Sequence, residues 1–165
     1  MWSPLRLFAW VSVAVLPALL PTASVQGAEP EALVAVVPSI KSIESVNPGE
    51  LQVEWAWIVK EKPENDWTVF FHLRKSGVES DQGFSAGDYK PNLPTSSWRR
   101  GKTMTEFRRA SIPADLSGKF DVLVGLYQEE GGQRAFLDCT MDPNKRFLAG
   151  QLEITDGRVK FTPSR

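Results

Sequence analysis

The segment at residues 51–59 constrains the fold most, because it alternates strictly between two faces. It reads LQVEWAWIV, and its odd-numbered positions are all large and apolar: Leu51, Val53, Trp55, Trp57 and Val59. Side chains of a β-strand point alternately to opposite sides, so all five share one face. The pattern predicts a half-buried antiparallel strand whose two tryptophans pack in the core.

Further short strands follow along the chain, separated by turn signals such as NPGE, EKPEND and EEGGQR. The predicted strands cover residues 40–46, 51–59, 67–74, 102–112, 119–128, 134–139 and 146–155. The strand at 134–139 is expected to pair back through a hairpin turn at Gly131 and Gly132. No window has a helical period. These features predict an all-β fold, a single immunoglobulin-like antiparallel β-sandwich of about seven or eight strands.

Residues 75–101 lack alternation and are rich in Gly, Pro, Ser and Asp. So long a stretch without secondary structure is uncommon in a compact domain. We therefore expect a short strand near 78–81 and an ordered crossover at 89–98.

The N-terminus has the composition of a secretory signal peptide. A single arginine, Arg6, precedes an apolar run that is too short for a membrane span, and small residues follow it. Cleavage is expected after Gly27, with Ala28 as the alternative last residue removed and an uncleaved anchor as the alternative fate. The predicted organisation is a signal peptide at 1–27, a linker or short edge strand at 28–38, the sandwich at 39–160 and a tail at 161–165.

Charge and cysteine content limit the partners. The chain has a formal net charge of −1, which argues against nucleic acid and against simple electrostatic membrane binding. Its only cysteine, Cys139, leaves no intrachain disulfide and is expected to be a buried small apolar residue.

The segment PTSSWRRG contains the strongest binding candidates, Trp98, Arg99 and Arg100, with Tyr89 nearby in sequence. An aromatic face can stack on a sugar, and arginine can donate to hydroxyl or anionic groups. The alternative is that Trp98 plugs the open end of the sandwich. The preceding Pro-Thr-Ser and the following glycine shape the backbone, which favours the plug.

Catalytic patterns are weak. GFSAG at 83–87 matches the nucleophile-elbow pattern around Ser85, but no apolar strand precedes it and the only histidine, His72, lies upstream. His72 is therefore interpreted as a half-buried pairing residue, and one His with one Cys cannot supply a structural zinc site. No pair of carboxylates stands out as a glycosidase pair.

Two loops are rich in acids that could hold Ca²⁺ or simply be solvated. Glu79, Asp81 and Asp88 lie in one loop, and Asp138 and Asp142 in the other. No repeat spacing typical of a calcium loop is present, so solvated acids are the favoured interpretation and no metal or cofactor is predicted. Tyr127, beside Gly125, is expected to hydrogen-bond to a loop backbone as a corner tyrosine does.

Several motifs occur in a recognisable order: NPGELQVEWAW, WTVFFHL, LPTSSWRRG, ASIPADLSGKFDVLVGLY and GGQRAFL. From about Val46 to Leu137 the chain resembles a bacterial immunoglobulin-like β-sandwich module, the extracytoplasmic C-terminal portion of envelope glycosyltransferase-like membrane proteins. The resemblance implies the fold and a non-catalytic role. Such modules have Asp soon after the Trp-x-x-Gly segment, where this chain has Glu106.

We therefore expect an exported protein, periplasmic or extracellular, without a membrane span after signal cleavage. Its expected role is a non-catalytic binding or accessory module that contacts an envelope glycan or an envelope protein, the glycan resting on family analogy. One alternative is an assembly protein that pairs through a sheet edge, and the other is a small hydrolase.

Overall fold

The computed structural model describes residues 32–78 and 83–164, and these form an all-β fold with one turn of 3-10 helix, η1 (Thr95–Ser97). The strands are β1 (Leu33–Val34), β2 (Val36–Asn47), β3 (Glu50–Val59), β4 (Thr68–Lys75), β5 (Gly83–Ser85), β6 (Thr103–Ser111), β7 (Gly118–Tyr127), β8 (Phe136–Leu137), β9 (Phe147–Thr155) and β10 (Arg158–Pro163). The predicted signal peptide, Glu79 and Asp81 lie outside the described residues, as does most of the strand predicted near 78–81.

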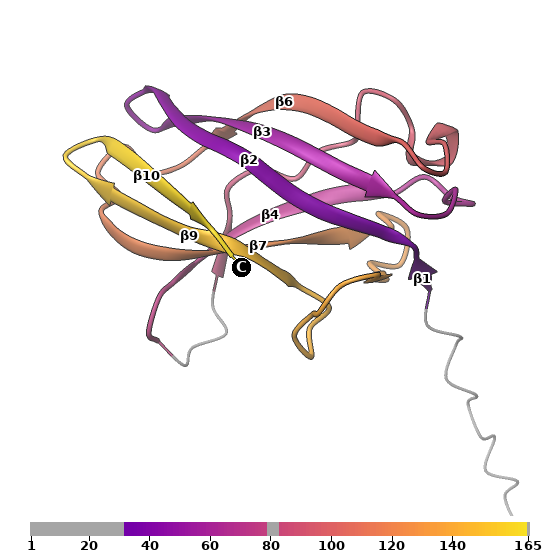
Figure 1. The fold of residues 1–165 in the computed structure, drawn as a ribbon. Coiled ribbons are helices and arrows are strands. Elements are labelled where there is room, and N and C mark those ends of the chain that lie inside the picture. The colour runs from indigo at the N-terminus through magenta and orange to yellow at the C-terminus, as the bar shows by residue number, and fades with distance from the viewer. Residues whose placement is uncertain (1–31, 79–82, 165) are drawn as a thin grey trace, which may run out of the picture.

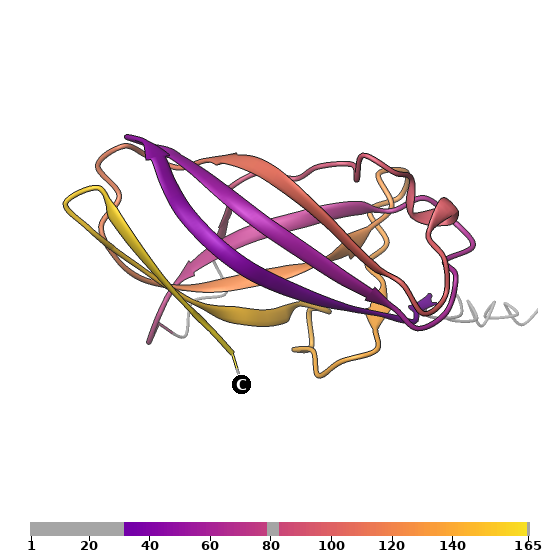
Figure 2. The same ribbon diagram turned by 45° about the horizontal axis from the view of Figure 1, so that its top comes forward.

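Eight of the strands form two antiparallel sheets that pack face to face, and β1 and β8 form a separate two-stranded parallel sheet. One sheet has the order β2-β3-β6, and the other has the order β10-β9-β7-β4-β5. Figure 1 shows the first sheet lying over the second, and Figure 2 shows the twist of the strands across each other. An immunoglobulin sandwich places strands A, B and E in one sheet and C, F and G in the other, and β2, β3, β6 and β4, β7, β9 match them. The predicted sandwich is confirmed, with ten strands instead of seven or eight.

The predicted alternation is confirmed on the inner faces. All five odd-numbered residues of 51–59 are buried, as are Trp67, Val69, Phe71 and Leu73. Trp55 stacks on Trp57 with ring centroids 6.1 Å apart, and the edge of Phe71 meets Trp55 from the facing sheet. This aromatic cluster occupies the core between the sheets, near the end where β3 finishes.

Strands extend beyond both predicted boundaries of the sandwich. The expected linker at 28–38 contains β1 and the start of β2, because Leu33 and Val34 pair in parallel with Phe136 and Leu137 of β8. The expected tail at 161–165 belongs in part to β10, which pairs with β9 as far as Pro163.

The hairpin predicted after β7 is shorter than expected. Gly131 and Gly132 have φ angles of +81° and +68°, so the turn has the glycine conformation that was predicted. Beyond it only Arg134 bridges to Tyr127, while Phe136 and Leu137 turn away to β1. The predicted strand at 134–139 is thus divided between two partners.

The crossover that follows β5 is ordered, as predicted, and closes one side of the sandwich. The main chain of Tyr89 exchanges two hydrogen bonds with Val69 of β4, and the carbonyl of Ala86 accepts from Ser111 of β6. Since these bonds reach both sheets, the crossover is fixed before it arrives at η1.

Candidate functional site

Trp98 lies inside the protein at the end of the sandwich. Its side chain is 1% exposed, packs on Trp57 with centroids 5.8 Å apart, and donates from Nε1 to the carbonyl of Leu93 at 2.9 Å. The hypothesis that Trp98 offers its face to a ligand is therefore corrected, because core residues cover the ring. Trp98 instead closes the open end of the sandwich, which is the alternative that the sequence favoured.

The other three candidates do not join Trp98 in one surface. Arg99 and Arg100 are exposed, and Arg100 lies 3.3 Å from a carboxylate oxygen of Glu61. Tyr89 is partly buried, and its ring packs against Trp55 at the margin of the core. Burial separates the aromatic candidates from the cationic ones, and only the arginines are left to face a partner.

The polar residues before Trp98 tie two loops together. The hydroxyl of Thr95 accepts from the backbone N–H of Trp67 at 2.9 Å and donates to the carbonyl of Asn65 at 2.8 Å. The Asp66 carboxylate accepts from the backbone N–H of Ser96 at 3.0 Å. Each loop thereby satisfies main-chain groups of the other, which fixes the β3–β4 loop against η1.

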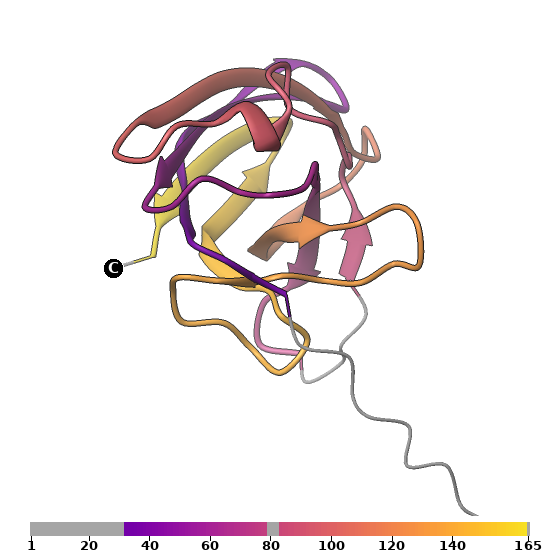
Figure 3. The same cartoon turned by 90° about the vertical axis from the view of Figure 1, so that its right-hand side faces the viewer.

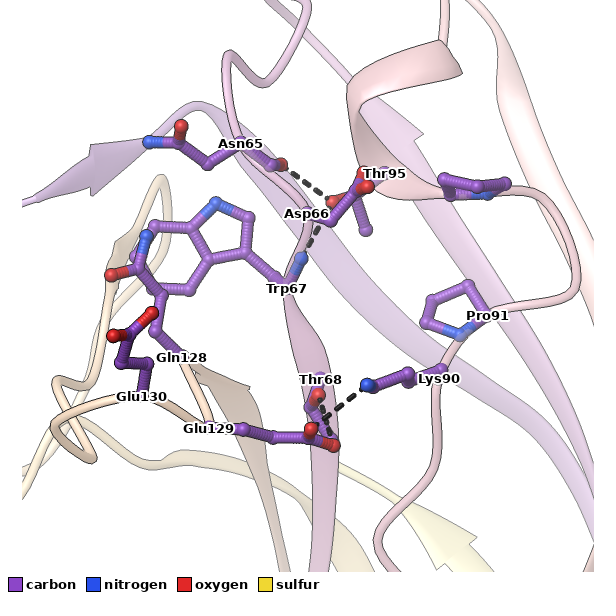
Figure 4. A pocket seen from close by; sticks show the side chains of 11 residues that line it. Asn65, Asp66, Trp67, Thr68, Lys90, Pro91, Thr95, Gln128, Glu129 and Glu130 are labelled. Carbon is purple, nitrogen blue, oxygen red and sulfur yellow. Dashed lines mark hydrogen bonds and ion pairs between the residues drawn. The ribbon is translucent and has the colours of Figure 1, made fainter.

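A cleft of about 440 Å³ opens at this end of the sandwich. Three segments form it: the β3–β4 loop and the start of β4, the crossover before η1, and the turn after β7 (Figure 4). Figure 3 looks onto this end of the molecule. The residues that line the cleft are Asn65, Asp66, Trp67, Thr68, Lys90, Pro91, Pro94, Thr95, Gln128, Glu129 and Glu130. In Figure 4 the Trp67 ring lies beside Gln128 and Glu130, and Lys90 and Pro91 form the other side.

The lining of the cleft is acidic. Lys90 is paired with Glu129, their Nζ and Oε2 atoms being 2.8 Å apart, and the Thr68 hydroxyl donates to the same carboxylate at 3.2 Å. These bonds lower the pKa of Glu129, and a hydrogen bond from Ser96 lowers the pKa of Asp66. Both carboxylates are therefore ionised at neutral pH, and the cleft keeps an excess of negative charge.

A half-buried ion pair supports the crossover wall of the cleft from the side of β6. Glu106 and Arg108 of β6 form an ion pair at 3.0 Å; Glu106 accepts from the backbone N–H of Asn92, and Arg108 donates to the carbonyl of Lys90. Arg108 also lies 4.7 Å above the ring of Tyr89. The wall is thus held by side-chain bonds to its main chain.

The Tyr89 hydroxyl lies between Trp57 Nε1 and the Glu106 carboxylate. Burial is the main cause of the raised pKa of Tyr89, and the negative charge of Glu106 adds to it. Trp57 Nε1, Tyr89 Oη and Glu106 Oε1 are all buried without a well-formed hydrogen bond to the described residues. Glu106, the acidic residue that follows the Trp-x-x-Gly segment, therefore points inward and holds the crossover through Asn92.

Ser85, His72 and Asp88 meet on the outer face of the five-stranded sheet. His72 and Ser85 are opposite each other on β4 and β5, and Asp88 lies 3.7 Å from His72 Nε2. The Ser85 hydroxyl donates to Asp88 at 2.8 Å. A catalytic triad needs the histidine between serine and carboxylate, whereas here the carboxylate occupies that place. The arrangement does not activate Ser85 as a nucleophile.

We expect the single histidine to make stability depend on pH from about 7.5 downward, through the pKa values of the unfolded and folded chain. Burial lowers the pKa of His72 from 6.5, with Arg134 and Arg146 acting in the same direction and Asp88 opposing them. The unfolded chain then binds a proton more readily than the folded one. The free energy of unfolding should decrease as pH falls through 6.5 and level off below the folded pKa.

Urea unfolding at several pH values measures this dependence. A His72→Gln variant should have a flat profile over the same interval, because the chain has no other histidine. An unchanged slope in the variant would assign the dependence to other groups.

The carboxylates of the second acidic loop bind basic side chains of the protein, whereas the carboxylates of a calcium site would bind the ion. Asp138 is paired with Lys60 at 2.7 Å, and Asp142 accepts from Arg146 Nε at 2.7 Å. Within the described residues, no three His, Cys, Asp or Glu side chains lie close enough to hold a metal ion. The described acids act as ion-pair partners and caps in their loops.

Two smaller predictions have mixed outcomes. Tyr127 lies against the Asp88 carboxylate, so its partner is an acidic side chain and not the loop backbone that was expected.

Cys139 is half-buried and is a free thiol, and burial raises its pKa to about 11. A thiol with so high a pKa is a poor nucleophile at neutral pH.

Comparison with known proteins identifies no relative. No protein-family model matches the chain, and no curated protein matches its sequence. The resemblance to the envelope module therefore stays a prediction.

In the part of the chain that the structure describes, no helix is long and apolar enough to cross a membrane.

The sequence does not reveal the cleft, because the segments that line it have the composition of ordinary turns. Taken alone, EKPEND and EEGGQR indicate turns and nothing more. In an immunoglobulin sandwich the B–C and F–G loops lie at the same end, and the β3–β4 loop and the turn after β7 correspond to them. That correspondence is the signal that could have brought the two segments together.

Proposed function

We propose that the protein is an exported, non-catalytic binding module of the bacterial cell envelope, and that it holds a saccharide in the cleft between its three loops. The observation that carries this proposal is the cleft itself: about 440 Å³, within the size range of small-ligand sites, with apolar and polar groups together. Export rests on the signal-peptide pattern, and the envelope setting rests on the family resemblance.

The chemistry of the lining supports a saccharide over an extended peptide. Peptides that add to a sheet need free main-chain groups, but the Trp67 N–H and the carbonyls of Asn65 and Lys90 are already bonded within the protein. The cleft offers side-chain carboxylates and amides for hydroxyl groups. Pro94, which is exposed, provides apolar surface for the C–H groups of a sugar ring.

The charge of the cleft supports a neutral or amine-bearing sugar. Three carboxylates and one ammonium group line it, so a uronate, sulfate or phosphate group would be repelled. Of the hydroxyl and anionic groups expected as partners of Arg99 and Arg100, the cleft therefore suits the hydroxyl groups. Binding to neutral and amine-bearing saccharides should therefore exceed binding to their anionic counterparts on a saccharide array.

We expect Glu130→Ala to weaken saccharide binding by about tenfold or more, because it removes a charged acceptor for a hydroxyl group. Glu130 is exposed on the cleft rim, so the variant should remain folded. Calorimetric titration with a saccharide that binds the unaltered protein measures the change.

The matched control is Glu44→Ala, which removes an exposed acid from β2 outside the cleft. It should bind as the unaltered protein does. Equal affinities of both variants would place the ligand elsewhere on the surface.

A role in assembly through a sheet edge has less support from two of the described edge strands, β2 and β10. β2 contains Pro38 and Lys41 and has two irregularities in its pairing, and β10 ends at Pro163. Proline, lysine and bulges on an edge strand discourage pairing with another chain.

A further inference from the structure

A second, smaller hollow lies next to the cleft. It measures about 90 Å³ and is lined by Pro91, Asn92, Leu93, Trp98, Met104, Thr105 and Glu106. Pro91 lines both the hollow and the cleft, so residues 91–94 form a ridge between the two.

The ridge is held in place from inside. The carbonyl of Leu93 accepts from Trp98 Nε1 at 2.9 Å, and the backbone N–H of Asn92 donates to Glu106 at 3.1 Å. The Leu93 side chain, in contrast, is 44% exposed. A ligand that extends from the cleft to the hollow would therefore cross the fixed main chain of the ridge and the Leu93 side chain. Because the ridge is already ordered, binding there would cost little conformational entropy of the protein.

The hollow has the chemistry of a site for an uncharged unit. Glu106 is neutralised by its ion pair with Arg108, so the carboxylate adds little net charge. Asn92 and Thr105 offer polar side chains, and Leu93 and Met104 offer apolar surface. The same combination of hydroxyl partners and apolar faces occurs in the cleft.

We infer that the ligand is a saccharide chain and not a single sugar: one unit occupies the cleft, and the chain continues over Leu93 into the hollow. This inference rests on the proposed function and adds the length of the ligand to it. Two hollows on either side of a fixed ridge fit consecutive units of a polymer, and their contacts add because the units are linked.

The experiment compares single sugars with oligomers of the same sugars, from a neutral and amine-bearing saccharide array, on the full chain. Oligomers should bind at least about tenfold more tightly than the single sugar, which corresponds to 1.4 kcal/mol of additional contact. The Leu93→Ala variant should lose this advantage and keep the affinity for the single sugar. The main-chain carbonyl that holds Trp98 is retained in the variant.

Val46→Ala is the matched control, because Val46 is equally apolar, is 41% exposed and lies near the β2–β3 turn, away from the cleft. It should keep the preference for oligomers. Urea unfolding of both variants checks that each is folded.

Each outcome has one meaning. Equal affinity for single sugars and oligomers overturns the second subsite and leaves the cleft as the binding site. A preference for oligomers that persists in Leu93→Ala also overturns the assignment to this ridge. If no saccharide of any length binds, the proposed function fails and this inference fails with it.

Discussion

Replacing Trp98 by alanine is expected to lower the free energy of unfolding by about 3–5 kcal/mol, the range for removing a large aromatic side chain from a core. Trp98 is 1% exposed and packs on Trp57, so its removal leaves a cavity at the end of the sandwich. The hydrogen bond from Nε1 to Leu93 is lost as well, and this bond is one of the two that hold the ridge beside the cleft from inside. Urea or thermal unfolding measures the loss.

Two comparisons separate this structural role from a direct role in binding. Arg99→Ala, at the next position but exposed, should change stability by less than about 0.5 kcal/mol. Trp98→Phe should restore part of the packing but not the hydrogen bond, and should lie between alanine and the unaltered protein. A Trp98→Ala variant of normal stability would contradict the plug.

Replacing Gly125 by alanine is the second change with a large expected effect, about 1–3 kcal/mol of destabilisation or more from overpacking. A Cβ atom at this position would lie 2.6 Å from Cε1 of Phe70 and 3.1 Å from the carbonyl oxygen of Lys145. Phe70 is on the outer face of the five-stranded sheet, yet it is 1% exposed and also lies under Arg134 at 4.8 Å. The ring therefore has little room to move aside.

A double-mutant cycle tests the cause. Phe70→Leu removes the ring that the new methyl group meets, so Gly125→Ala should cost less in the Phe70→Leu background than in the unaltered protein. Equal costs in the two backgrounds would mean that the backbone contact with Lys145, and not the ring, limits this position.

The inner faces of the strands could be predicted residue by residue, because the two-residue period of a strand is a local property. It placed Trp55 and Trp57 inside correctly. The outer faces could not be predicted in the same way. The two-residue period places Phe70 on the outer face of the five-stranded sheet, away from the core. Phe70 is nevertheless buried, because residues after β7, Arg134 among them, pack over that face.

Local irregularities also changed what the pattern predicted. Ile40 and Ile43 are an odd number of residues apart, so alternation alone assigns them to opposite faces. Both are buried in the core, since the pairing of β2 with β3 shifts between Ile40 and Ser42. A bulge adds a residue to one strand and restores the inward direction of the second side chain.

The candidate site was predictable only in part. The backbone-shaping residues around Trp98 favoured a plug, and the buried ring agrees with it. The cleft did not emerge, because Asp66, Lys90 and Glu129 lie in three separate segments with the composition of ordinary turns. Nothing in each segment alone indicates that the others lie beside it.

The sequence by itself determined the all-β class, the inward faces of its strands and the turns between them, since these follow from side-chain period and from the φ angles that glycine and proline favour. The tertiary structure alone decided which segments meet. It paired Leu137 with Val34, placed Asp88 between Ser85 and His72, and brought three loops around one cleft. Such contacts depend on how the sheets close over the core, and closure is a property of the whole chain.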